Sequence, residues 1–355
     1  MNRNYFVFLL IIIILSSCEK YESNCNDNPS LCEENVNTTP FTLSFPSNFP
    51  SPNIPTSNPL TEEGINLGRH LFYDPILSSD NTVSCASCHK QESAFGDNTQ
   101  FSFGVNQAIG DRHAPTIMNA AFQNNFDWDG KSNTLEEQAA RPILNEIELH
   151  NNNWMEVINR LEMSEIYPHL FCLVFGTETI DSSHVVMAIS QFERSLVSYN
   201  SRFDQWLNGE IMFTEEEIDG FNIYATERGD CFHCHPIGLF TDDIFHNNGL
   251  DSEFTDLGRY DITGNPLDRG LFKSPTLRNI EFSAPYMHDG RFNTLEEVID
   301  HYNFGGYDSP TVDPLMKYVG IGLLLTAEEK ENLKAFLLTL SDENFINNTQ
   351  FSNPF

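Results

Sequence analysis

Basic side chains are scarce in this chain of 355 residues. Lys and Arg together number 19 against 51 Asp and Glu, which gives a formal net charge of −32 at pH 7. Because nucleic-acid binding needs a basic surface to neutralise phosphates, this shortage excludes nucleic acid as a partner. The acidic surplus favours solubility, and it can also attract a basic partner.

Long apolar runs are also scarce. The run Phe6–Leu15 follows a short basic start and is too short to span a membrane comfortably. It ends in Leu15-Ser16-Ser17-Cys18, which resembles a bacterial lipoprotein signal, where the cysteine becomes the lipidated first residue. We therefore expect residues 1–17 to be a signal peptide and Cys18 to anchor the protein in the bacterial cell envelope, facing the periplasm or in the outer membrane.

Eight cysteines are too few for a disulfide-built fold of this length. Residues 18–59 are rich in Asn, Ser, Thr and Pro, which is typical of a flexible tether. Cys25 and Cys32 lie in this segment and are candidates for a small disulfide in an oxidising compartment. Cys172, inside the apolar run 170–175, is expected to be a buried thiol.

Four other cysteines form two Cys-x-x-Cys-His motifs. The first is Cys85-Ala-Ser-Cys88-His89, and the second is Cys231-Phe-His-Cys234-His235. In this spacing both thiols can reach the vinyl groups of one haem while the imidazole meets the iron. A zinc site could use the four thiols but would not explain a histidine after each pair. The motifs predict two covalently bound c-type haems.

Strand signals are hard to find, whereas helix signals recur. Thr214–Glu217 and Thr326–Glu329 are capping boxes, and the second opens a segment with Leu333, Phe336, Leu337 and Leu340 on one face. These patterns predict an all-α protein in which each motif adjoins a helix of a small cytochrome c-like unit.

The two halves of the chain repeat each other. Residues 114–119 match 274–279, and residues 129–137 match 289–297, each at an offset of 160 positions. A constant offset implies duplicated domains with one haem each. The same offset aligns Pro142 with Tyr302. Because a tyrosine oxygen can bind haem iron and proline cannot, the second haem is expected to be capped and the first open.

Beyond the motifs, the chain resembles the bacterial di-haem cytochrome c peroxidase and MauG family. The resemblance runs from about Gly64 to Leu340 and rests on residues 68–74, both haem motifs, 126–130, 136–139, 142–148, 273–279 and 284–290. It implies two cytochrome c-like domains. Residues 60–205 would carry the peroxide-reacting haem on His89, and residues 206–345 the electron-transfer haem on His235.

The resemblance also implies roles at the first haem. Glu148 matches the family's distal acid/base, Gln138 its neighbour, and Trp128 the tryptophan between the haems. Peroxide cleavage needs a group that takes a proton from one oxygen and delivers it to the other. A carboxylate in a dry pocket can have its pKa raised enough for this task.

Three departures from the family pattern matter. The loop Gly104–Gln107 lacks the histidine that closes the first haem in many of these peroxidases. Tyr302 stands where they have methionine, as in MauG. His113 replaces an asparagine that helps to hold calcium, which makes this ion doubtful even though Ser283 and Pro285 match its backbone ligands.

These features predict a di-haem peroxidase that reduces hydrogen peroxide with electrons from a small cytochrome or cupredoxin, entering at the C-terminal haem. MauG-like oxidation of a protein side chain is the alternative enzyme. A non-enzymatic di-haem electron shuttle is the third hypothesis, although it would need neither an open iron nor a distal acid. A homodimer is compatible with each of them.

Overall fold

The computed structural model describes Cys32 and residues 38–355, which are mainly helical. Two short strands, β1 and β2, pair antiparallel with Phe245 opposite Lys273. The elements in chain order are α2 (Glu62–Tyr73), η2 (Pro75–Leu77), α3 (Cys85–Cys88), η3 (Gln91–Ser93), η4 (Val105–Gln107), η5 (Ala120–Phe122), α4 (Leu135–Leu144), α5 (Trp154–Glu162), α6 (Tyr167–Phe175), α7 (Ser182–Ser195), α8 (Arg202–Leu207), α9 (Glu215–Tyr224), η6 (Cys231–His233), β1 (Phe245–His246), α10 (Tyr260–Thr263), η7 (Pro266–Asp268), β2 (Phe272–Lys273), α11 (Leu295–Phe304), α12 (Ala327–Leu338) and α13 (Glu343–Ile346).

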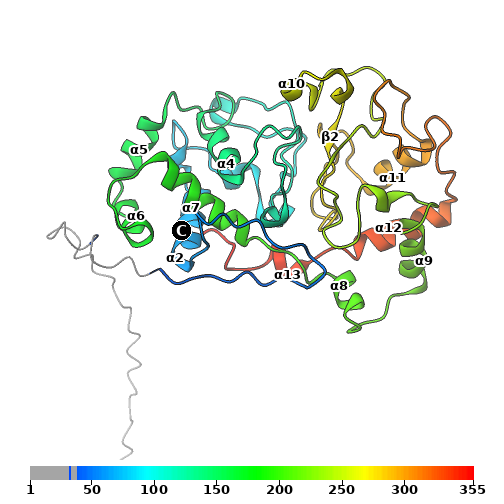
Figure 1. Cartoon of the computed structure of the whole chain (residues 1–355), viewed down its shortest axis with the longest axis horizontal. Helices are drawn as coiled ribbons and strands as arrows, with labels where there is room; N and C mark the ends of the chain where they lie inside the picture. Colours follow the sequence, from blue (N-terminus) through cyan, green and yellow to red (C-terminus); the bar gives the residue numbers. More distant parts are fainter. Residues whose placement is uncertain (1–31, 33–37) are drawn as a thin grey trace, which may run out of the picture.

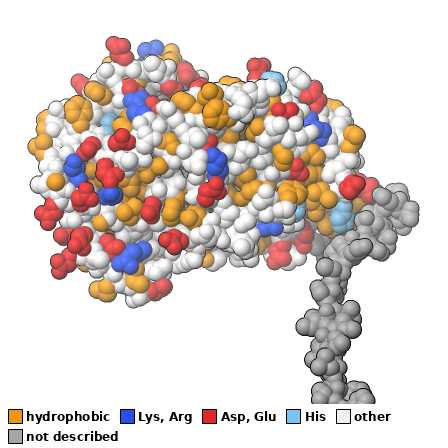
Figure 2. Space-filling view, turned by 180° about the vertical axis from the view of Figure 1, so that it is seen from behind, with side chains coloured by type: hydrophobic (Ala, Val, Ile, Leu, Met, Phe, Trp, Pro, Cys, Tyr) orange, Lys and Arg blue, Asp and Glu red, His pale blue; other side chains and the backbone are white. Residues whose placement is uncertain are grey.

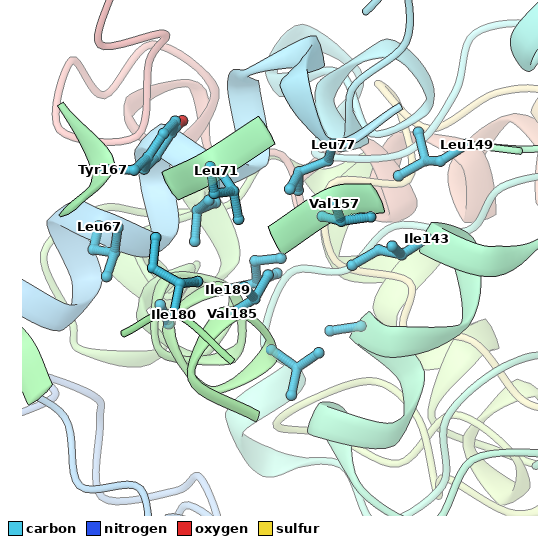
Figure 3. Close-up of a cluster of buried hydrophobic side chains, with 14 of the residues drawn as sticks. Leu67, Leu71, Leu77, Ile143, Leu149, Val157, Tyr167, Ile180, Val185 and Ile189 are labelled. Carbon is cyan, nitrogen blue, oxygen red and sulfur yellow. The ribbon is translucent and has the colours of Figure 1, made fainter. Parts of the chain in front are cut away.

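The helices form two lobes that lie side by side (Figure 1). The core of the first lobe lies among α2, α4, α5, α6 and α7, where Leu67, Leu71 and Ile189 are buried (Figure 3). The core of the second lobe includes Phe203, Phe336 and Leu340. Within the described residues, no helix combines the length and apolarity that crossing a membrane requires.

Each lobe contains a pair of helices that cross at a glycine. A Cβ on Gly68 of α2 would overlap the carbonyl oxygen of Ala188 in α7, and one on Gly220 of α9 would overlap that of Asn332 in α12. The predicted capping boxes at Thr214 and Thr326 are present and begin α9 and α12. Glycine therefore lets the backbones approach closely at matching places in the two lobes.

Other local features repeat at the predicted offset. Helix α4 spans residues 135–144 and α11 spans residues 295–304. Thr134 and Thr294 cap these helices, accepting hydrogen bonds from Glu137 N at 3.1 Å and Glu297 N at 3.2 Å. Pro142 and Tyr302 thus occupy the same turn of corresponding helices.

The second half of the expected tether is part of the folded body. Residues 38–60 run along the lower edge of both lobes (Figure 1), and Phe49 is buried beneath the guanidinium of Arg278, 4.7 Å from the ring centroid. Asn58 donates to Glu136 at 2.7 Å and to the carbonyl of Met187 at 3.0 Å. Apolar burial and these bonds fix a segment whose composition alone favours flexibility. Cys18 and the rest of the tether, apart from Cys32, lie outside the described residues.

The cysteine predictions need correction. Cys32 forms a disulfide with Cys172, 140 residues later in the sequence, so Cys172 is not a free thiol and Cys32 does not pair with Cys25. The fold brings the end of α6 to the start of the described chain, a proximity that sequence spacing does not indicate. Cys25 lies outside the described residues.

The boundary predicted between residues 205 and 206 falls inside α8, and Phe203 of this helix packs in the second core. The chain after α13 returns to the first lobe (Figure 1), where Arg69 and Tyr73 donate to the carbonyls of Gln350 and Phe351 at 2.7 and 2.8 Å.

Candidate haem sites and active site

The first motif forms α3 and the turn that follows it. Cys85 and Cys88 are not in a disulfide within the described chain, and Nδ1 of His89 lies 2.9 Å from the carbonyl oxygen of Phe95. Since a carbonyl oxygen only accepts, Nδ1 carries the proton and Nε2 keeps its lone pair. Burial lowers the pKa of His89, which favours the neutral imidazole that binds iron. These residues fit a covalent haem.

The second motif repeats this arrangement. Nδ1 of His235 lies 3.1 Å from the carbonyl oxygen of Phe240, and burial lowers the pKa of His235 as well. Cys231 and Cys234 are likewise outside any disulfide of the described chain. The same local geometry therefore occurs at both motifs, as expected for two sites of one kind.

A large, mainly apolar cavity adjoins the second motif. It is lined by Cys231, Cys234 and His235 and also by Tyr302 and Met316. Asn248 Nδ2 donates to the Tyr302 hydroxyl at 3.3 Å, and burial raises the pKa of Tyr302 to about 12. A cavity of this lining fits a haem, and Tyr302 and Met316 are lining side chains whose oxygen or sulfur atom would be able to bind its iron.

Glu148 lies close to the first motif. Burial raises the pKa of both Cys85 and Cys88, and the charge of Glu148 adds a smaller effect, so its carboxyl group lies within electrostatic range of the two thiols. Burial, assisted by the charge of Asp127, raises the pKa of Glu148 to about 7. Asn145 Nδ2 donates to Glu148 Oε1 at 2.7 Å. The carboxyl group can therefore exchange a proton near neutral pH, as an acid/base residue requires.

The loop that lacks a histidine holds Glu148 directly. Val105 N donates to the carbonyl of Glu148 at 2.9 Å, and a Cβ on Gly104 would overlap the carbonyl oxygen of Ile147. Gln138 lies in α4 with a half-buried side chain, three residues after the helix begins. The observed neighbour of the Glu148 carboxyl group is thus Asn145, which no sequence pattern singled out as a site residue.

Hydrogen bonds to backbone carbonyl groups connect Trp128 to the second lobe by way of His113. Its indole Nε1 donates to the carbonyl of His113 at 2.8 Å, and His113 N donates to the carbonyl of His288 at 2.8 Å. The His288 ring stacks on Phe272 with centroids 3.6 Å apart. Trp128, His113 and His288 line the same cavity as the second motif. A short bonded route therefore leads from the first lobe to this cavity.

The donor atoms at the expected calcium site suit calcium poorly. His113 is buried, and its Nδ1 lies 3.1 Å from the carbonyl oxygen of Thr99. Ser283 and Pro285 line the large cavity with it. Calcium takes six to eight oxygen ligands, and an imidazole in place of an amide oxygen removes one. We assign calcium no role in the chemistry.

His246 is a neighbour of the second motif that sequence patterns did not single out. Its two ring nitrogens lie 2.8 Å from Asp242 Oδ2 and 2.7 Å from Asp313 Oδ2. Burial alone lowers the pKa of His246, but hydrogen bonds to Asp242, Cys234 and Asp313 raise it, which favours the charged imidazole. Through Asp313, His246 links the segment before Met316 to strand β1, to which it belongs. No spacing signal in the sequence could have revealed this, because Asp313 is 67 residues away.

Comparison with known proteins identifies the relatives of this chain. A family model described as di-haem cytochrome c peroxidase matches residues 62–212. The methylamine utilization protein MauG of Methylorubrum extorquens is 38% identical over 293 residues, 81% of each chain. The cytochrome c551 peroxidase of Nitrosomonas europaea is 35% identical over 260 residues, 72% of this chain and 77% of its own. The chain belongs to the di-haem cytochrome c peroxidase family.

Solved structures agree with this membership. A MauG-like protein associated with microbial copper homeostasis is 38% identical and has a TM-score of 0.83, covering 88% of this chain and 99% of its own. A diheme peroxidase from Burkholderia thailandensis, at 21% identity and a TM-score of 0.73 over 81% of this chain and 88% of its own, shares the fold. The protein is therefore a helical oxidoreductase of the peroxide-reacting class, and the family implies two c-type haems, which agrees with the two attachment motifs.

Proposed function

We propose that this protein reduces hydrogen peroxide at the haem held by His89, with electrons that enter at the haem held by His235. The observation that carries the proposal is Glu148. It is a half-buried carboxyl group near the first motif, and its pKa is about 7. The neighbouring helix has Pro142 where the second lobe has Tyr302. Peroxide would thus meet an acid/base residue without a competing protein ligand.

The residues of the first lobe have separate tasks in this reaction. The bound haem supplies the redox chemistry that splits the oxygen–oxygen bond. Glu148, as carboxylate, takes the proton from the near oxygen of peroxide and delivers it to the departing oxygen, so that water leaves. Asn145 orients the carboxyl group, and the Gly104–Gln107 loop fixes its backbone. Gln138 is assigned to the same pocket by family resemblance.

We assign one haem to each lobe, and the repeated features support a duplicated origin. The crossings at Gly68 and Gly220 and the capped helices α4 and α11 recur in both lobes. Electrons would pass from the second lobe by way of Trp128, whose bonds to His113 and onward to His288 bridge the lobes. The donor is a small redox protein, a cytochrome or cupredoxin, and the protein would work in the cell envelope.

Acidic side chains are spread over both lobes on the face drawn in Figure 2. Together with the net charge of −32, they favour a donor with a basic contact surface. Such attraction mainly raises the association rate and weakens as salt increases.

MauG-like oxidation of a protein side chain is the second candidate. It is favoured by Tyr302, whose hydroxyl faces the second cavity, and by the 38% identity to MauG and to a MauG-like protein associated with copper homeostasis. A relative of that kind would leave a modified residue on a partner protein rather than consume a soluble electron donor.

Peroxide turnover separates these candidates. The oxidised protein is mixed with peroxide, and then a reduced cytochrome is added. Catalytic oxidation of the cytochrome supports the peroxidase. A reaction with peroxide but no cytochrome turnover supports protein oxidation, and no reaction in a protein with an intact haem spectrum supports the electron shuttle.

A further inference from the structure

Glu193 is a buried carboxyl group that the proposed reaction does not use. It lies in α7 with 5% of its surface exposed, and its Oε2 has no hydrogen-bond partner among residues 38–355. A carboxylate in such a place loses its hydration without compensation, whereas the protonated acid is tolerated. Glu193 therefore needs either a partner from outside the polypeptide or a proton.

A second buried polar group without a partner in the described chain lies one turn earlier in α7. Ser190 is fully buried, and its Oγ also lacks a hydrogen-bond partner in the described chain. Residues three apart occupy the same face of a helix, so the hydroxyl and the carboxyl group are neighbours. Buried polar groups without partners are rare in folded proteins, and two on one helix face indicate a polar function there.

The surrounding charges leave Glu193 without a cation of its own. Arg194 donates to both carboxylate oxygens of Glu136 from α4, at 2.6 and 2.9 Å. From α2, Arg69 points to the C-terminal segment, where it donates to Gln350. The third element packed on α7, η5, consists of Ala120, Ala121 and Phe122 and carries no charge. Neutralisation of Glu193 is thus left to a proton.

The first haem motif is a further neighbour of Glu193. Burial raises the pKa of Cys85, and among the surrounding charges that of Glu193 adds most to this effect. Cys85 is an attachment point for the first haem in the proposed function. Phe192 and Leu196, on either side of Glu193, pack in one buried cluster with Cys85, so this part of α7 adjoins the site of that haem.

We propose that Glu193, supported by Ser190, is a proton-uptake site coupled to reduction of the first haem. In the oxidised protein the positive charge of the ferric iron would compensate the Glu193 carboxylate. When one electron arrives from the donor by the route proposed above and removes that charge, one proton from water converts the carboxylate to the acid, so that the net charge of the pocket is unchanged. Burial raises the pKa of Glu193 to about 8, although Arg194 opposes this, so the exchange falls near physiological pH. The inference rests on the proposed function only in requiring a haem at Cys85 and His89.

The test is a redox titration of the two-haem protein at several pH values, followed by electron paramagnetic resonance to resolve the two ferric centres. The potential of one centre should fall with rising pH around 8, by up to ~59 mV per pH unit, because a tenfold change in proton concentration then changes the equilibrium tenfold. Glu193→Gln should flatten this slope. Glu92→Gln removes an exposed charge from the same segment as the first motif and should leave it intact.

A slope that persists in Glu193→Gln overturns the proposal. Should that variant fail to bind haem, the Glu148→Gln protein offers a second measurement, since it retains Glu193. Its infrared difference spectrum on reduction should gain the carbonyl band of a protonated carboxylic acid, and the absence of this band also overturns the proposal. Neither measurement needs peroxide turnover, so an inactive protein can support the role of Glu193 and an active one can refute it.

Discussion

Glu148 is the residue on which the proposed peroxidase activity depends most. Replacing it with glutamine removes the proton relay, and we expect the rate of reaction with peroxide to fall by about 10²- to 10⁴-fold. The carboxylate is the form that accepts the proton, and its pKa is about 7. The wild-type rate should therefore rise with pH and level off above about 7, whereas the variant should be insensitive in that range. Stopped-flow mixing of oxidised protein with peroxide measures both effects.

Glu146 provides the matched control. It is exposed and lies two residues before Glu148, so Glu146→Gln makes the same chemical change on the same loop and should leave the rate unchanged. An unimpaired Glu148→Gln variant would remove Glu148 from the mechanism. A wild-type reaction that begins only after half-reduction would mean that a side chain such as His113 closes the first haem at rest.

Tyr302 is the residue that we expect to cap the second haem. If its oxygen binds the iron, Tyr302→Phe converts that haem from six- to five-coordinate and leaves the first haem largely unaltered. Absorption and electron paramagnetic resonance spectra of the oxidised protein show the change as loss of a low-spin signal. Tyr307→Phe, at an exposed position on the following segment, is the control. A surviving low-spin signal in Tyr302→Phe would assign the cap to Met316, which lines the same cavity.

At the scale of elements, the Gly104–Gln107 loop and the Glu148 turn form one packed unit. A Cβ on Gly104 would overlap the carbonyl oxygen of Ile147 and lie 2.7 Å from that of Glu148. Forcing such contacts apart typically costs about 1–3 kcal/mol. We expect Gly104→Ala to lower the free energy of unfolding by this amount and to slow the peroxide reaction.

Gly110→Ala, three residues after this loop, is the control variant for Gly104→Ala. Its Cβ would meet no atom closer than 3.8 Å, an ordinary contact, so stability should change by at most about 0.5 kcal/mol. Denaturant unfolding followed by haem absorbance measures both variants. Equal stability and equal peroxide rates in the two proteins would show that the loop does not hold the distal carboxyl group.

At the scale of the whole molecule, the Cys32–Cys172 disulfide closes a loop of more than a hundred residues around the first lobe. Removing a disulfide typically costs about 2–4 kcal/mol of stability. Cys172→Ser should lower the free energy of unfolding by this amount, as should a reductant acting on the wild type. The reductant should have no further effect on the variant. If a reductant still lowered the stability of Cys172→Ser, this would instead support a Cys25–Cys32 bridge.

The mature chain is expected to begin at Cys18 with a covalently attached lipid. The apolar run Phe6–Leu15 followed by Leu15-Ser16-Ser17-Cys18 is the reason for this prediction. Intact mass and metabolic labelling with a fatty acid test it. A soluble product cut at another position, or one that retains residues 1–17, would refute it, and Cys18→Ser is the control that should lose the label.

The sequence alone determined the features that depend on local spacing. Cys85, Cys88 and His89 are close along the chain, so their chemistry follows from their order, and the same holds for Cys231, Cys234 and His235. Helix starts at Thr214 and Thr326 follow from residues three positions apart. The family was evident as well, since its motifs are short and ordered.

Only the tertiary structure decided features that join distant residues. Cys32 pairs with Cys172 because α6 ends beside the start of the described chain. Residues 38–60 are fixed because both lobes supply them with apolar surface. The Gly104 loop meets Glu148 through the folding of two separate segments. Glu193 looks like any helical glutamate in the sequence. Its importance arises from burial beside Cys85 without a partner in the described chain, and burial is a property of the packed molecule.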